Sequence, residues 1–153
     1  MKLSKRSEYG LKALIDLAAS YGEGVVGARQ IAEKHGISVK FLEQILLDLR
    51  RAGILHSRLG VHGGYYLAHP PAEVTIGHVV RTLDGTIAPI RCVSRISYER
   101  CSCPDEATCE LRLIMLDVRN AIAGVLDSIS LADIVQNARL HTSGLLESLS
   151  GQP

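Results

Sequence analysis

Residues 28–68 read ARQIAEKHGISVKFLEQILLDLRRAGILHSRLGVHGGYYLA, and this stretch decides the fold. Its first part predicts a short helix over 28–35 that Gly36 closes, and a second helix that runs from Ser38 to about Arg51. Apolar residues recur at helical spacing along the second helix: Phe41, Leu42, Ile45, Leu46 and Leu49. Two helices joined by a tight glycine-containing turn form the helix-turn-helix pattern.

A β-hairpin is predicted directly after these helices. Strand-like segments at 54–58 and 65–68 flank a glycine-rich turn at 60–64. A hairpin behind a helix-turn-helix makes a winged helix. Apolar spacing also predicts helices over 9–19 and 76–83, so we expect a mainly α fold with a small β-hairpin wing, occupying residues 1–85.

The composition agrees with a globular helical protein. The 153 residues are 46% hydrophobic and 22% charged, which excludes wholesale disorder. Only 4% are aromatic and Trp is absent, so the core must be largely aliphatic. The net charge of +1 conceals a basic N-terminal part, because residues 1–60 hold ten Lys and Arg but six Asp and Glu. A basic region favours a polyanionic partner.

The second helix of a helix-turn-helix inserts its N-terminal half into the major groove of double-stranded DNA. Glu43 can accept a hydrogen bond from the cytosine amino group, and Gln44 can pair with adenine. The alternative for the helix residues is an ordinary exposed helix face. The alternative for the wing is a plain hairpin turn. The candidate DNA contacts on the helix and the hairpin are Ser38, Lys40, Glu43, Gln44, Arg50, Arg58, His62 and Gly63.

All four cysteines lie in one irregular segment, 86–110, in the pattern C-x8-C-x-C-x5-C: Cys92, Cys101, Cys103 and Cys109. Scattered core cysteines would not cluster in this way. Three interpretations compete: an iron–sulfur cluster, a structural zinc site, or redox-active disulfides. Zinc knuckles with the C-x2–4-C spacing are absent, and a disulfide within C-x-C would be strained. A metal or cluster is therefore favoured.

An apolar stripe follows at alternating four- and three-residue steps, which is the a/d pattern of a coiled coil. The region 111–135 is therefore predicted to hold a dimerisation helix and a short following helix, and 136–153 a flexible tail. The predicted dimer contacts are Leu111, Met115, Val118, Ile122, Val125 and Ile129.

Other function classes find no support in the sequence. No P-loop, G-x-S-x-G elbow or H-E-x-x-H motif is present, so we expect no enzyme. Charged residues interrupt every apolar run near the N-terminus, and no stretch approaches a membrane span. A cytoplasmic protein without membrane contact is expected.

The chain resembles the Rrf-type winged-helix transcription regulators over about residues 1–135. The residues that carry the resemblance are the segments 1–4, 9–11, 31–33, 36–38, 41–46, 49–55, 63–65, 67–68 and 131–134. The resemblance implies a homodimeric regulator, a repressor, that binds a palindromic operator. It also implies a [2Fe–2S] or [4Fe–4S] cluster that controls DNA affinity in response to iron, redox state or nitric oxide.

Within this family, Cys92, Cys103 and Cys109 match the three cluster cysteines best, and Cys101 is a departure. One branch has a histidine ligand three residues beyond the last cysteine, where this chain has Arg112, which cannot ligate. Another branch uses an acidic residue from the N-terminal helix of the other subunit, which corresponds to Glu8. Cys101 and Glu8 are thus rival fourth ligands, and a thiol–disulfide switch or a structural zinc dimer remain the alternative functions.

Overall fold

The structure, a computed structural model, describes residues 2–138 of the chain. Its elements are α1 (Lys5–Ala19), α2 (Ala28–His35), α3 (Val39–Arg51), β1 (Leu55–Arg58), β2 (Gly64–Leu67), the 3-10 turn η1 (Pro71–Glu73), α4 (Ile76–Asp84), the 3-10 turn η2 (Arg91–Val93) and α5 (Glu110–Ser128). A further helix covers 131–138. The predicted fold class is confirmed. Of the predicted tail, 136–153, residues 139–153 lie outside the described part of the chain.

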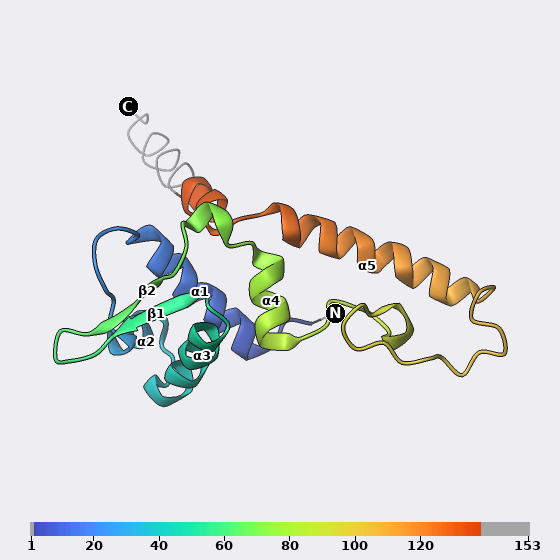
Figure 1. Cartoon of the computed structure of the whole chain (residues 1–153), viewed down its shortest axis with the longest axis horizontal. Helices are drawn as coiled ribbons and strands as arrows, with labels where there is room; N and C mark the ends of the chain where they lie inside the picture. Colours follow the sequence, from blue (N-terminus) through green and yellow to red (C-terminus); the bar gives the residue numbers. More distant parts are fainter. Residues whose placement is uncertain (1, 139–153) are drawn as a thin grey trace, which may run out of the picture.

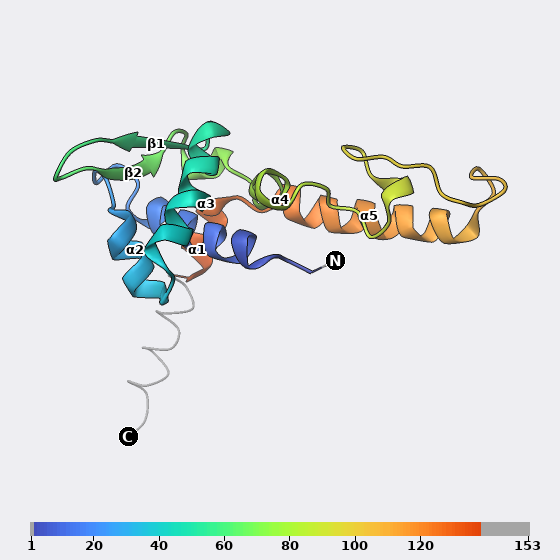
Figure 2. The ribbon, with the colours of Figure 1, turned by 90° about the horizontal axis from the view of Figure 1, so that it is seen from below.

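The molecule consists of a body and an arm (Figure 1). Helices α1 to α4 and the hairpin form the body, and α5 extends away from it as the arm. The segment between α4 and α5 runs outward beside α5 to its far end, as the second view also shows (Figure 2). None of the helices within residues 2–138 is long and apolar enough to cross a membrane.

The core of the body is aliphatic, as the composition predicts. Helix α3 contributes four fully buried side chains at helical spacing, Leu42, Ile45, Leu46 and Leu49. Phe41 differs from the prediction, because it is 39% exposed and packs edge-on against Tyr9 of α1, with ring centroids 6.0 Å apart.

The wing is a two-stranded antiparallel hairpin in which Leu55 pairs with Leu67 and Arg58 with Gly64. Val26 extends the pairing, since its N–H and C=O both bond to Tyr65 at 2.9 Å. Gly63 is required at the turn, because a Cβ there would lie 2.1 Å from the carbonyl oxygen of Arg58. The hairpin is therefore joined along β2 to the segment before α2 and closed by glycine near its tip.

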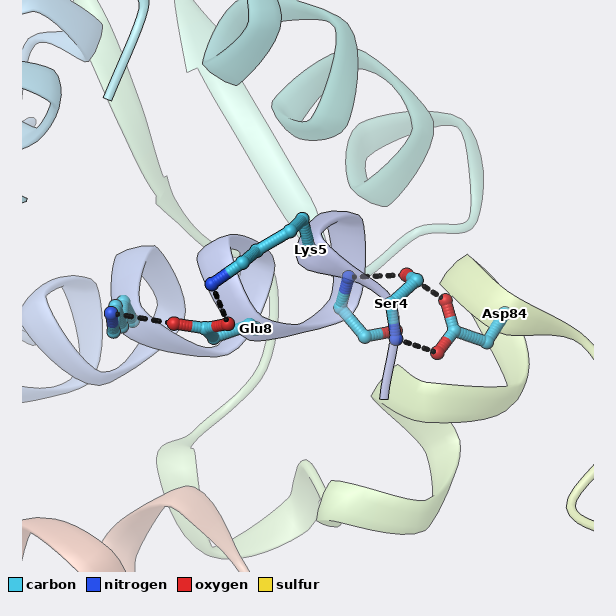
Figure 3. Close-up of polar contacts among 6 residues, drawn as sticks. Ser4, Lys5, Glu8 and Asp84 are labelled. Atoms are coloured by element: carbon cyan, nitrogen blue, oxygen red, sulfur yellow. Dashed lines mark hydrogen bonds and ion pairs between the residues drawn. The ribbon is translucent and has the colours of Figure 1, made fainter. Parts of the chain in front are cut away.

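Helix α1 begins at Lys5, four residues before the predicted start at residue 9. The first turn is polar, so apolar spacing does not detect it. Ser4 caps this turn by accepting a hydrogen bond from the N–H of Ser7 at 3.1 Å. Ser4 also donates its hydroxyl and its N–H to the carboxylate of Asp84, at the end of α4 (Figure 3). This contact joins the first and last helices of the body.

The segment that follows α5, residues 129–131, is held against the body by backbone hydrogen bonds. The N–H of Ile76 donates to the carbonyl of Ile129 at 2.9 Å, and the N–H of Leu131 donates to Val74 at 2.9 Å. Leu131 is fully buried in the body's core. Ser130 and Asp133 cap the following helix reciprocally. The 131–138 helix therefore packs on the winged-helix body, although the sequence prediction grouped it with the long helix.

We predict that Ser4→Ala lowers the free energy of unfolding by about 1 kcal/mol at pH 7, because it removes an N-cap oxygen. Burial raises the pKa of Asp84, but the hydrogen bonds from Ser4 outweigh it, so the pKa lies below its ordinary value. The Ser4–Asp84 contribution is therefore complete above the ordinary pKa of about 4 and is lost as the pH falls through the folded value.

Urea unfolding at pH 7 and pH 3 measures this effect. The difference between wild type and Ser4→Ala should shrink at pH 3 without vanishing, because the cap to Ser7 survives acidification. Ser128→Ala, an exposed change at the end of α5, serves as the control and should stay within about 0.5 kcal/mol of wild type. A difference for Ser4→Ala that grows on acidification would contradict the assignment.

Candidate DNA-binding surface and cysteine cluster

The outer face of α3 presents the polar residues that the sequence assigns to base contacts. Lys40, Glu43 and Gln44 are exposed, opposite the buried apolar face of the helix. Over residues 2–138, no ion pair or side-chain hydrogen bond engages these three residues. Ser38 is the N-cap of α3 and accepts a hydrogen bond from the N–H of Phe41 at 3.4 Å. The face is thus polar and free to contact a ligand.

Two arginines connect this face with the wing. Arg50, near the end of α3, donates a hydrogen bond to the Ser57 hydroxyl of β1 at 2.9 Å. Arg58, at the end of β1, donates to the carbonyl of His62 across the turn at 3.3 Å. Arg50 therefore braces α3 against the wing, whereas Arg58 and His62 are exposed at the tip end of the hairpin.

The tip of the wing carries two apolar residues that the sequence analysis missed. Leu59 is 91% exposed and Val61 is 98% exposed. Proteins that bind the minor groove of DNA frequently insert apolar side chains between base steps, so Leu59 and Val61 are candidates for such contacts. Two large aliphatic residues inside a glycine-rich turn are the signal that could have identified them.

The four cysteines come together in the segment beside the outer part of α5. The sulfurs of Cys103 and Cys109 lie 3.4 Å apart. Cys92, Cys101 and Glu106 bring one potential ligand atom each within 4.8 Å of one another. Cys101 also interacts with Cys103, so the thiols form a continuous chain from Cys92 to Cys109.

Three of the cysteine thiols have shifted pKa values. Burial and the neighbouring Cys101 raise the pKa of Cys92. Hydrogen bonds with Cys101 and Cys109 raise the pKa of Cys103 to about 12. In contrast, the backbone N–H of Arg112 and the Cys103 thiol lower the pKa of Cys109, which is the N-cap of α5. Among Cys92, Cys103 and Cys109, Cys109 therefore becomes a thiolate, the form that binds metal, most readily.

Glu106 is a carboxylate beside the cysteines that the sequence analysis did not identify. Its Oε2 accepts a hydrogen bond from the hydroxyl of Tyr98 at 2.6 Å, and its Oε1 lies 3.5 Å from Nε of Arg112. Arg112, which replaces a possible histidine ligand, therefore faces a carboxylate at the cysteines. An acidic residue between Cys103 and Cys109 is the sequence signal that was available.

Glu8, the rival fourth ligand, lies on α1 in the body. Its carboxylate contacts Lys5 at 2.8 Å and Lys12 at 2.9 Å (Figure 3). The hydrogen bonds from these two lysines lower the pKa of Glu8, which keeps it ionised. Within one chain Glu8 is not brought to the cysteines, and its role as a ligand across a dimer stays a prediction.

The apolar stripe of α5 divides between two directions. Ile122 and Ile129 pack against the core of their own body, and Met115 is half-buried. Leu111, Val118 and Val125 remain exposed at 57%, 37% and 58%. Ile114, 58% exposed and not among the predicted contacts, shares their face. The exposed row therefore lies part of a helical turn away from the predicted stripe. The reason is that the inner half of α5 packs against the body of its own chain.

A polar helix face, a glycine-closed wing and a buried aliphatic core define the class of winged-helix DNA-binding proteins. Comparison with known proteins gives the family. The model of the Rrf2 family, described as iron-dependent transcriptional regulators, matches residues 3–137, and the chain belongs to this family. The members compared are transcriptional regulators and not enzymes, which confirms the prediction of a non-enzyme.

Three relatives illustrate the similarity. The protein rrf2 of Nitratidesulfovibrio vulgaris is 40% identical over 140 residues, which are 92% of this chain and 91% of that protein. The solved structure of CymR, the global cysteine regulator of Bacillus subtilis, is 34% identical with a TM-score of 0.75, covering 90% of this chain and 98% of CymR. The structure of T. potens IscR is 34% identical with a TM-score of 0.72, covering 90% and 88%.

The position of Glu43 leads to a prediction about base selection. A carboxylate near phosphates weakens binding unless a base donates to it, so Glu43→Ala should bind a broader set of sequences at similar non-specific affinity. Arg58→Ala, the matched control on the wing, should weaken binding to all sequences and reduce the salt dependence. Selection from random DNA measures both, and identical preferences for wild type and Glu43→Ala would contradict the assignment.

Proposed function

We propose that the protein is a homodimeric transcription repressor of the cytoplasm, and that an iron–sulfur cluster bound by its cysteine segment controls affinity for a palindromic operator. The observation that carries the proposal is the convergence of four thiols in one segment beside the α5 arm. The family description as iron-dependent regulators supports it.

The donor set fits an iron–sulfur cluster, because such clusters are held by cysteine thiolates. Cys92, Cys103 and Cys109 would supply three ligands. Cys101, Glu106 or the partner subunit's Glu8 would supply the fourth, and the cluster would be [2Fe–2S] or [4Fe–4S]. When bound, it would supply a redox couple whose potential depends on charge, hydrogen bonds and solvent exposure around the sulfurs.

Residues between the cysteines and the body provide a route for control. Cys92 lies in η2 and is 5% exposed, so any displacement of its side chain moves its neighbours. Ser94, next to this turn, bonds to the hydroxyl of Thr86 at 2.7 Å, two residues beyond the end of α4. A change at Cys92 is therefore transmitted to α4. To alter DNA affinity, the two states must differ in free energy between DNA-bound and free forms.

The dimer is supported by the exposed row on α5 formed by Leu111, Ile114, Val118 and Val125. Such a row on a protruding arm leaves apolar surface in water unless a partner covers it. A second copy of the chain presents the same row, which suits a two-fold interface. The helix α3 and the wing of each subunit, related by this symmetry, match the two halves of a palindromic operator.

One observation favours a second candidate function, a thiol–disulfide switch. Cys103 and Cys109 already lie with their sulfurs 3.4 Å apart. Closing a disulfide between them would need only a small approach, with the two electrons and protons passing to a cellular thiol oxidant. A structural zinc site at Cys92, Cys101 and Glu106 is the third alternative.

Anaerobic purification with metal analysis separates these functions. Visible absorption with iron and sulfide in the protein supports the cluster. A colourless protein whose free thiol count falls on oxidation supports the disulfide switch, and stoichiometric zinc supports the structural site. Either of the last two results would overturn the proposal.

Substitution of single ligands gives a sharper prediction. Cys92→Ala and Cys109→Ala should yield colourless protein, because a cluster that loses one of three thiolates does not assemble. Cys101→Ala should keep its colour if a carboxylate fills the fourth position, and then Glu8→Ala or Glu106→Gln should shift the spectrum. Full iron and sulfide content in Cys92→Ala or Cys109→Ala would contradict the ligand assignment.

The dimer is tested on the exposed face of α5. Val118→Asp should convert the dimer to monomer at micromolar concentration, because two buried carboxylates would face each other across the two-fold axis. Leu113→Asp provides the matched control, since Leu113 is 48% exposed on the opposite side of the helix. Sedimentation velocity measures both, and an unchanged dimer with Val118→Asp would show that another surface forms the interface.

A further inference from the structure

A cavity of about 220 Å³ lies where the arm joins the body, away from the predicted DNA contacts. It is a half-open pocket between the end of α4, the segment that follows α4, and the middle of α5. Its lining residues are Arg81, Thr86, Ile87, Arg95, Ile96, Arg119, Asn120, Ala123 and Asp127. Three of them are arginines, although neither the DNA surface nor the cysteine cluster uses them.

Arg119 is the unusual residue of this cavity. It is only 8% exposed, and it is the one charged residue among the buried side chains of the described chain. Its Nε is buried without a hydrogen-bond partner, and no ion pair reaches its guanidinium from residues 2–138. Burial and the nearby Arg95 and Arg81 lower its pKa below the ordinary value. An arginine nevertheless keeps its charge in proteins, so this is a buried cation without a counter-ion.

The one carboxylate of the cavity does not neutralise Arg119. Asp127 is engaged by both terminal nitrogens of Arg81, at 2.6 and 2.9 Å. Gly77 of α4 permits this close approach, because a Cβ there would lie 1.9 Å from Oδ1 of Asp127. With Arg81 and Asp127 paired, Arg95 and Arg119 leave two formal positive charges at the cavity.

We propose that this cavity is a binding site for a small dianionic oxyanion, a phosphate group either free or carried by a small molecule. The guanidinium groups of Arg119 and Arg95 would hold two of its oxygens, since arginine binds phosphate through paired N–H donors. The Asn120 amide and the Thr86 hydroxyl, both in the lining, offer further donors. The volume fits a small anion and is below the usual range for larger ligands.

A carboxylate from a second copy of the chain is the competing partner for Arg119. Arg119 is already covered by α4, the following segment and α5 of its own chain, which leaves little of its side chain exposed to a second copy. The apolar row that we assign to the dimer, which includes Val118 and Val125, is exposed, whereas Arg119 points into its own chain and is buried. The anion site therefore does not need the dimer, and its Thr86 bonds to Ser94 on the route between the cysteine segment and α4.

Thermal unfolding of the full chain with inorganic phosphate tests the proposal, with potassium chloride at equal ionic strength as the reference. At a hundredfold excess over Kd, phosphate should raise Tm by about 5–10 °C. Arg119→Met should abolish this shift. Without phosphate its Tm should equal or exceed that of wild type, because the substitution removes an unpaired buried charge.

Two further variants keep the test decisive. Arg95 is exposed, so Arg95→Gln should fold normally and weaken phosphate binding about tenfold in calorimetry, by loss of one charged donor. Arg29→Met, an exposed arginine on α2 outside the cavity, is the control and should bind phosphate like wild type.

The remaining outcomes identify the source of the anion or overturn the site. Tighter binding of inorganic phosphate than of methyl phosphate indicates the free ion, and the reverse indicates the phosphate group of a small molecule. A phosphate shift no larger than that of chloride, or one that persists in Arg119→Met, contradicts the proposal. Dissociation of the dimer in Arg119→Met without any phosphate effect would assign Arg119 to the interface instead.

Discussion

The paired contact between Arg81 and Asp127, seated over Gly77, joins the arm to the body beside the backbone hydrogen bonds at Ile76 and Leu131. Helix α4 carries this contact on one side and the Asp84–Ser4 contact at its end. The same helix therefore fixes α5 and the first turn of α1. Because Gly77 has no side chain, the two helices approach closely enough for a bidentate ion pair. The geometry of the DNA-binding surface and of the arm both depend on α4.

The candidate DNA-binding surface and the cysteine segment thus lie in different parts of the molecule. Helix α3 and the wing lie on the body, while the segment that contains the four cysteines lies beside the arm (Figure 1). The covalent link between them is short, since η2 with Cys92 begins seven residues after α4 ends. A change at the thiols can therefore reach the body through α4 without passing along α5.

The sequence predicts the body well because its signals are local. The bounds of α2 agree fully, and α3 differs by the capping Ser38 alone, since apolar spacing and glycines mark both helices. The first turn of α1 escapes prediction because it is polar, and its contact with Asp84, eighty residues away in sequence, is visible only in the folded chain. The stripe of α5 marks an apolar helix, but spacing cannot say that Ile122 faces its own body while Val118 stays exposed. Arg119 likewise acquires its importance only from tertiary burial, whereas the place of Glu106 between Cys103 and Cys109 is visible in the sequence.

The cysteine segment has hydrogen bonds of its own that involve no sulfur. Tyr98 bonds to Glu106, Arg91 pairs with Glu99, and Asp105 accepts from the hydroxyl of Thr108 at 2.8 Å. Fixing one residue's backbone opposes folding by about 1–2 kcal/mol in conformational entropy. Here that entropy is already lost when the chain folds. A ligand that engages the thiols therefore binds a preorganised segment, and its affinity is not reduced by the ordering of a disordered loop.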